Sequence, residues 1–168
     1  IFIPLEEFLK KFERKTYHPG EEPHTCGEAT IMILGMGRVG AAIFENLSNK
    51  KFKVVGFDAD MDLVIQHRKI GKRVTFADAE DPSFWSQLRF GKLEAIILAL
   101  PEFSGQNWCT LQARKNGFSG KIIIPARSQG DPSVLKASGA DNIYDTYQSA
   151  GLGITEMLAN DKKVDTAD

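Results

Sequence analysis

Three glycines and one aspartate, at a spacing that suits phosphate and ribose binding, carry the clearest chemical signal in this chain. Gly35, Gly37 and Gly40 form a G-x-G-x-x-G pattern in the run ILGMGRVG, and Asp58 follows the last glycine by eighteen residues. In this pattern the glycines allow a tight turn, a close approach of the backbone to a phosphate, and close packing of the next helix. The N-terminus of that helix offers free N–H groups and a positive dipole end to the phosphate.

Asp58 ends the apolar run FKVVGFD, and it would set the preference among nucleotides. Its carboxylate can accept hydrogen bonds from both ribose hydroxyls, and its charge would repel a 2′-phosphate. NAD or an adenosine nucleotide is therefore favoured over NADP. The neighbouring residues in the predicted cofactor set are Met36, Arg38, Val39, Ala59 and Asp60. Two of them have alternatives: Asp60 is a good N-cap for a following helix, the role that we favour, and Arg38 suits either a phosphate contact or solvent.

Alternating strands and helices from residue 29 onward must position these residues. Strands are predicted at 30–34, 52–57, 73–76, 94–99, 121–124 and 142–144, and helices at 38–49, 61–69, 82–89, 104–116, 132–138 and 148–160. Asp81-Pro82 and Asp131-Pro132 mark two helix starts, because each places an N-cap acid before a proline. Strands this apolar, separated by helices, predict a Rossmann-like, doubly wound α/β fold: a parallel sheet of about six strands with helices on both faces.

The chain divides into a lead-in, one domain and a tail. Residues 1–17 have apolar residues at helical spacing and predict an amphipathic helix. We favour a connector that contacts a missing partner domain, and the alternative is a helix that packs against its own domain or a second copy. Turn formers at 18–28 predict a linker. The domain is expected to span 29–160, and a polar tail at 161–168 is expected to fray. Because the chain begins with isoleucine, we expect it to be part of a longer protein whose missing part lies in a membrane.

Composition excludes several classes of function. The chain has 168 residues and a formal net charge of −1 without a long basic run, so no nucleic-acid partner is predicted. His18, His24 and His67 are scattered, so no metal site is expected. Cys26 and Cys109 form no C-x-x-C motif, which is typical of a reducing compartment. No segment approaches the roughly eighteen apolar residues that a membrane span needs.

A series of motifs beyond the glycine turn resembles the TrkA-N family, also called KTN or RCK N-lobe domains. These motifs are GMGRVG, FDAD, FADAEDPSFWSQL, AIILALPE, KIIIPARS and SGADNIY, spread over about 29–160. The Gly-Asp-Ala usual after the third strand of the family reads Ala77-Asp78-Ala79 here, so the glycine is replaced while the acid and the alanine remain. The resemblance implies a regulatory domain of potassium channels and transporters, with Asp78 and Ala79 beside the adenine.

The end of the fourth predicted strand completes the expected cofactor site. Ala99, Leu100 and Pro101 lie there, and open α/β sheets bind ligands at the carboxyl ends of their strands. Leu100 and Pro101 would either cover the nucleotide or simply end the strand.

Within the family, the arginine of GMGRVG and the long lead-in look most like the cytosolic domain of Kef-type antiporters, glutathione-gated systems that exchange K⁺ for H⁺. This resemblance implies a homodimer with an adenine nucleotide, AMP or NAD(H), in each cleft. It also implies a membrane transport domain in the same or a partner chain, with this soluble part at the cytoplasmic face of the bacterial inner membrane. Arg38 and Arg127 match places where arginines bind glutathione or its adducts in Kef relatives.

Two other functions stay open. A freestanding regulatory subunit of a Trk-type potassium uptake system is one, although the 28-residue lead-in points to a connector. An NAD-dependent oxidoreductase is the other, but no His–Asp pair or Tyr-x-x-x-Lys arrangement could move a proton beside a hydride. We therefore expect a regulatory domain with no catalytic residues, in which Trp85, Trp108 and Cys109 serve packing.

Overall fold

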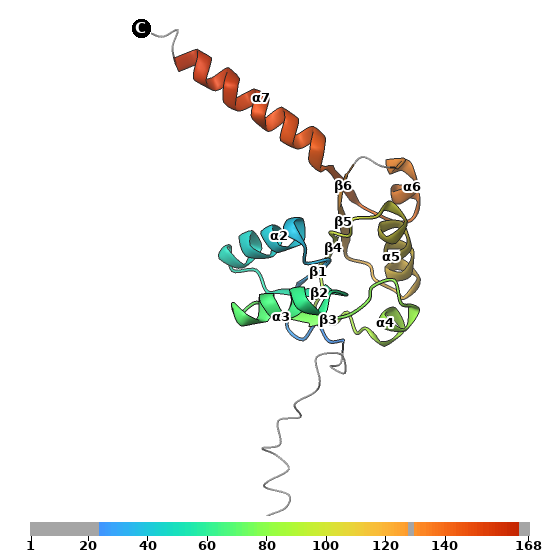
Figure 1. Cartoon of the computed structure of the whole chain (residues 1–168). Helices are drawn as coiled ribbons and strands as arrows, with labels where there is room; N and C mark the ends of the chain where they lie inside the picture. The colour runs from blue at the N-terminus through green and yellow to red at the C-terminus, as the bar shows by residue number, and fades with distance from the viewer. Residues whose placement is uncertain (1–23, 128–129, 165–168) are drawn as a thin grey trace, which may run out of the picture.

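The computed structural model describes residues 24–127 and 130–164, in which six strands alternate with six helices (Figure 1). The strands are β1 (Ile31–Leu34), β2 (Val54–Asp58), β3 (Val74–Phe76), β4 (Ala95–Leu98), β5 (Lys121–Ala126) and β6 (Asn142–Asp145). The helices are α2 (Arg38–Asn49), α3 (Met61–Lys69), α4 (Pro82–Gln87), α5 (Phe103–Lys115), α6 (Pro132–Ala137) and α7 (Thr146–Val164). The predicted connector helix at 1–17 lies outside the described residues.

All six strands are parallel and form one sheet in the order β3-β2-β1-β4-β5-β6. The chain starts at the central strand β1, builds outward to β3, and then crosses back to β4 on the other side of β1. This is the strand order of the Rossmann fold, in which ligands bind beyond the carboxyl ends of the strands where the order reverses. The predicted fold class is confirmed.

Helices cover both faces of the sheet (Figure 1). On one face α2 and α3 pack over a core that includes Met36, Phe44 and Val64. On the other face α4, α5 and α6 pack over a larger core that includes Trp85 and Leu135. The four residues of β1 are all buried, as a central parallel strand with helices on both sides requires.

The end of the predicted linker belongs to the domain instead. Thr25 forms a parallel bridge with Arg89, and the Nη2 group of Arg73 donates to the Thr25 carbonyl at 3.2 Å. Cys26 is 2% exposed and belongs to the core. Because Arg89 pairs in this bridge, α4 ends at Gln87 rather than at the predicted residue 89.

The last helix is longer than predicted. Asp145 accepts hydrogen bonds from the N–H groups of Tyr147 and Gln148, so α7 begins at Thr146 rather than at 148. It continues to Val164, so the first four residues of the predicted tail are helical, while 165–168 lie outside the described residues.

Helix α7 extends away from the sheet (Figure 1). Its apolar side chains are uncovered, with exposed fractions from 59% to 70% for Leu152, Ile154, Met157 and Leu158. Tyr144 in β6 is also 56% exposed. It alternates with Ile143, which packs on the core beneath α5 and α6, so Tyr144 faces the other side of the sheet. The edge of the sheet at β6 therefore lacks a cover on that side.

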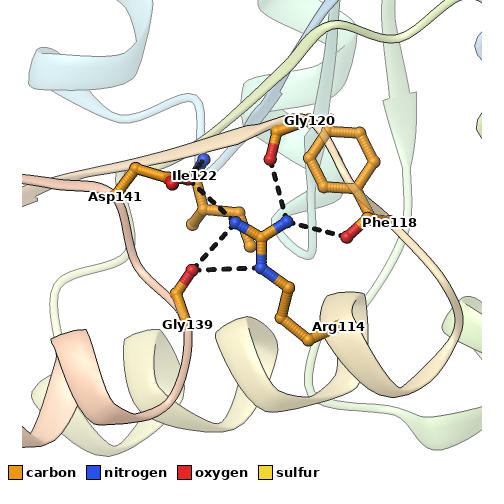
Figure 2. Close-up of polar contacts among 6 residues, drawn as sticks. All are labelled: Arg114, Phe118, Gly120, Ile122, Gly139 and Asp141. Carbon is orange, nitrogen blue, oxygen red and sulfur yellow. Dashed lines mark hydrogen bonds and ion pairs between the residues drawn. The ribbon is translucent and has the colours of Figure 1, made fainter.

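One arginine joins α5 to the amino ends of β5 and β6 (Figure 2). The five N–H groups of Arg114 all donate, and their acceptors are the carbonyl oxygens of Phe118, Gly120 and Gly139 and the carboxylate of Asp141. Asp141 also accepts from the N–H of Ile122 at 2.7 Å. This cluster joins α5 to the amino ends of β5 and β6. The cleft described below lies at the other edge of the sheet, beyond the carboxyl ends of the strands.

Candidate functional site

A cleft of about 360 Å³ opens beyond the carboxyl ends of β1 to β4, at the reversal of strand order. Segments that follow β1 to β4 form most of its walls, because the carboxyl ends of parallel strands meet at one edge of the sheet. It brings together every residue predicted for the cofactor site except Met36, Gly40 and Asp60. Arg127, which the resemblance suggested as an effector contact, also lines it.

The three exceptions serve the fold around the cleft. The side chain of Met36 is fully buried in the core beneath α2 and α3. A Cβ at Gly40 would collide with the carbonyl oxygen of Gly35, so this glycine lets α2 start close to the turn, as predicted. Asp60 accepts hydrogen bonds from two N–H groups in the first turn of α3, which is the N-cap role that we favoured.

The glycine turn presents bare backbone to the cleft. Gly35 has a φ of +90°, a conformation that glycine adopts without strain, and a Cβ there would lie 2.7 Å from the carbonyl oxygen of Ala99. Gly37 has a negative φ and open space, with no atom within 4 Å of where a Cβ would lie. Helix α2 therefore begins at the cleft with the backbone of Gly35 and Gly37 uncovered by side chains of their own.

The N-terminus of α2 has free donors. Gly37 is the N-cap residue, no side chain caps the helix, and its first turn has no acidic residue. The first N–H groups of a helix have no acceptor within the helix. Together with the helix dipole, these groups favour an anion at this end of the cleft.

Asp58 serves both the turn and the cleft. Its Oδ2 accepts from the N–H of Met36 at 2.5 Å, and its Oδ1 accepts from the N–H of Asp60 at 2.8 Å. Each carboxylate oxygen has a second lone pair, so Asp58 can still accept from ribose hydroxyls. From its sequence position we predicted only the contact with the ribose, and not the two hydrogen bonds that hold the turn.

The segment after β3 forms the opposite wall and is anchored from two helices. Trp85 and Cys109 both donate to the carbonyl of Ala79, at 2.8 Å and 3.3 Å, and Trp108 donates to the carbonyl of Glu80 at 3.1 Å. Trp85 and Cys109 are buried, as predicted. Trp108 is 37% exposed, so the prediction that it packs inside the domain is only partly correct.

Four residues that line the cleft were not predicted: Phe57, Leu63, Ala77 and Glu80. Ala77 and Glu80 flank the Asp78-Ala79 pair, so the FADAED motif taken as a whole would have found them. Phe57 and Leu63 offer only apolar surface, and nothing in the sequence separates them from ordinary core residues.

Two cations face the cleft from segments after β1 and β5. Arg38 lies at the start of α2, and Arg127 follows β5. Arg127, like Pro101, also lines a neighbouring hollow of about 370 Å³ beyond β4 to β6. Guanidinium groups bind phosphate and carboxylate well, so both arginines suit an anionic ligand.

The described part of the chain shows neither a metal-binding cluster nor a membrane-spanning helix. In residues 24–127 and 130–164, no group of three or more His, Cys, Asp or Glu side chains could hold a metal ion. No helix in the same ranges is long and apolar enough to cross a bilayer.

The fold and the cleft define a Rossmann-type domain with a ligand cleft where its strand order reverses. The chain belongs to the TrkA-N domain family, whose model matches residues 31–146. The family inferred from the motifs is therefore confirmed.

The chain is also similar to individual proteins, one by sequence and two by structure. The chain is 25% identical over 133 residues to the Ktr system potassium uptake protein C of Bacillus subtilis (strain 168), a match that covers 79% of this chain and 60% of that protein. Among solved structures it resembles the TrkA-N domain of the inner membrane protein ybaL from Escherichia coli, with 19% identity, a TM-score of 0.65, and coverage of 76% and 95%. It also resembles the GsuK channel bound to NAD, with 20% identity, a TM-score of 0.64, and coverage of 83% and 26%. The structural likenesses show the fold.

Proposed function

We propose that this domain binds an adenine nucleotide in the cleft and thereby regulates a potassium transport system. The observation that carries the proposal is the uncapped N-terminus of α2, which opens through bare glycine backbone into the cleft. The phosphate would bind at this helix end, the ribose at Asp58, and the adenine beside Ala59 and Ala79. The carboxylate of Asp58 would accept from the ribose hydroxyls, and the guanidinium groups of Arg38 and Arg127 would suit the charge of the phosphate.

AMP or NAD(H) is the ligand class that we favour. Structures of GsuK, which has this fold, are described with NAD and with ADP bound, and these ligands share an adenosine and a phosphate. The carboxylate of Asp58 would lie near a 2′-phosphate, and like charges repel at short range. NADP(H) is therefore expected to bind less well.

The exposed helix α7 supports a homodimer. A helix of 19 residues is about 28 Å long, and its apolar residues are uncovered in a single copy. Apolar surface of this extent on a helix usually marks an interaction site. A second copy, bringing an equivalent helix to the uncovered sheet edge near Tyr144, would bury both.

We favour a Kef-type potassium/proton antiporter as the regulated system. The membrane transport domain would lie in the same or a partner chain, with this domain at the cytoplasmic face of the bacterial inner membrane. The ybaL domain, which comes from an inner membrane protein, supports this arrangement. Glutathione or its adducts would act through Arg38 and Arg127. The similarity to Ktr protein C favours a second candidate, a separate subunit of a Trk-type or Ktr-type uptake system.

Regulation requires the nucleotide to bind two arrangements of the dimer with different free energies. The first test is titration calorimetry with AMP, ADP, ATP, NAD⁺, NADH and NADPH. We expect micromolar binding of an adenosine ligand and weaker binding of NADPH. Failure of all six to bind would overturn the proposal, and turnover of NADH with an aldehyde or a keto acid would favour the oxidoreductase.

A pair of glycine variants makes this test specific to the cleft. Gly37→Ala adds a Cβ in open space at a negative φ, so the fold is retained while the phosphate site narrows. Gly151→Ala adds the same methyl group in open space on α7 and serves as the control. We expect affinity to fall in the first variant only. The coding sequence upstream then separates the two transport candidates, because membrane spans before Ile1 favour the antiporter.

A further inference from the structure

His67 in α3 contacts the glycine turn at the same residue, Met36, that Asp58 contacts. Its Nε2 lies 2.8 Å from the carbonyl oxygen of Met36, and 31 residues separate the two in the sequence. A carbonyl oxygen can only accept a hydrogen bond, so Nε2 must carry the proton and donate. No role for His67 was predicted, since its type and position in the sequence indicated neither a metal ligand nor a ligand contact.

The contacts of Asp58 and His67 fix two successive peptide groups of the turn. Asp58 accepts from the N–H of the peptide between Gly35 and Met36. His67 donates to the C=O of the next peptide, between Met36 and Gly37. The described residues contain no cis peptide bond, and in a trans peptide the C=O and N–H groups point in opposite directions. The bond from His67 therefore also sets the direction of the Gly37 N–H.

Among the described residues, no other hydrogen bond to that second peptide group is found. Glycine imposes little restriction on its own dihedral angles, so the Met36–Gly37 peptide could otherwise rotate at low cost. Gly37 lines the cleft, and in the described part of the chain no acceptor is found for its N–H. A donor that is free, fixed in direction and at the start of a helix suits an anion.

We infer that His67 is a positioning residue for the phosphate of the nucleotide. By holding the carbonyl of Met36, it keeps the N–H of Gly37 aimed at the phosphate, without touching the ligand itself. This inference rests on the proposed function. It predicts that His67 contributes to the affinity for phosphate and not to the affinity for adenosine.

The test compares ADP with adenosine in three variants. His67→Met fills a similar volume without a donor, His67→Gln keeps an Nε2 donor, and Gln66→Met is the control on the exposed side of the same helix. For His67→Met we expect about tenfold weaker ADP binding with adenosine binding changed by less than about twofold, the loss typical of one hydrogen bond to a charged group. His67→Gln should recover most of the ADP affinity.

An equal loss for both ligands, or no loss, would overturn the inference. Wild-type protein that binds neither ligand would overturn the proposed function instead. Thermal unfolding of each variant shows whether it is folded. If His67→Met does not fold, the ¹⁵N-labelled wild-type protein decides: the Gly37 amide resonance should shift with ADP and stay in place with adenosine. If the Gly37 amide resonance does not shift on addition of ADP, the inference is wrong.

Discussion

The indole of Trp85 and the carbonyl of Ala79 are joined by a 2.8 Å hydrogen bond beneath one wall of the cleft. Trp85 is 1% exposed and packs edge-on against Phe84, with ring centroids 5.2 Å apart. A buried indole N–H needs an acceptor, and here the acceptor belongs to a segment that lines the cleft. The wall after β3 is therefore held by the core of the domain.

Replacing Trp85 with phenylalanine should weaken this wall. Trp85→Phe keeps an aromatic ring but leaves the Ala79 carbonyl with only the thiol of Cys109 as donor, so we expect the free energy of unfolding to fall by about 1–3 kcal/mol. Urea denaturation measures this loss. Trp108→Phe removes an exposed hydrogen bond on the same wall and should cost less. Equal losses in the two variants would contradict the anchoring role.

Removing the arginine of Figure 2 should destabilise the other end of the sheet. Arg114→Met leaves three carbonyl oxygens without their donor, and we expect a loss of about 3 kcal/mol in the free energy of unfolding. Arg114→Lys keeps the charge beside Asp141 but loses the planar group that reaches several acceptors, so it should be intermediate. Chemical denaturation of both variants checks the order. Nucleotide affinity should not change, because the cluster lies at the amino ends of the strands.

Removing the charge of Asp58 should relax the discrimination against NADP(H). Asp58→Asn keeps the shape of the side chain, but its amide nitrogen cannot accept the N–H that the second oxygen now accepts. We expect the ratio of NADH to NADPH affinity to fall by about tenfold, since a charge that opposes the 2′-phosphate is lost. Calorimetry with both ligands measures the ratio. Asp62→Asn, on the exposed side of α3, is the control, and an unchanged ratio in Asp58→Asn would contradict the assignment.

Both cysteines should be unreactive in the folded protein. Burial raises the pKa of the Cys109 thiol to about 12, with smaller contributions from Glu80 and Asp78. Burial also raises the pKa of Cys26 to about 11, against an opposing effect of Arg73. Because the thiolate is the reactive form, iodoacetamide near pH 8 should label neither residue until the protein unfolds. Labelling of the native protein, read by mass spectrometry, would show that one of the thiols is accessible.

His24 should make the fold less stable in mild acid. Burial lowers the pKa of His24, and the nearby Asp81 opposes this shift in part. The unfolded state then takes up a proton below about pH 6.5 while the folded state does not, so the free energy of unfolding falls with pH until it passes the folded pKa. His24→Phe keeps the ring beside Phe84 and should remove this component. Denaturation midpoints of the two proteins, compared from neutral to mildly acidic pH, test the prediction.

Local signals in the sequence were sufficient for the order of the elements. Each strand is a short apolar run, and the Asp-Pro pairs at 81 and 131 do cap helices as predicted, with Asp81 and Asp131 each accepting from a backbone N–H. Boundaries were less accurate where a contact distant in the sequence sets them. The bridge between Thr25 and Arg89 shortens α4, and neither residue shows a strand pattern of its own.

The predicted site was limited by the direction of side chains. Gly35 and Gly37 line the cleft while Met36, between them, points into the core, because successive residues of the turn face opposite sides. A motif identifies which residues are close in sequence and leaves this alternation unstated. The contact between His67 and Met36 is harder still to predict, since it depends on how α3 packs against the turn.

The two tryptophans of the chain give the cleft an optical signal of its own. Trp85 is buried, whereas Trp108 is partly exposed and donates to the carbonyl of Glu80, a residue that lines the cleft. Indole emission depends on the solvent and the hydrogen bonds around the ring. Both indoles donate to residues that line the cleft, Trp85 to Ala79 and Trp108 to Glu80, but only Trp108 is also partly exposed to solvent, so we expect the larger change in emission from Trp108. Occupancy of the cleft can thus be followed by intrinsic fluorescence, without an added dye.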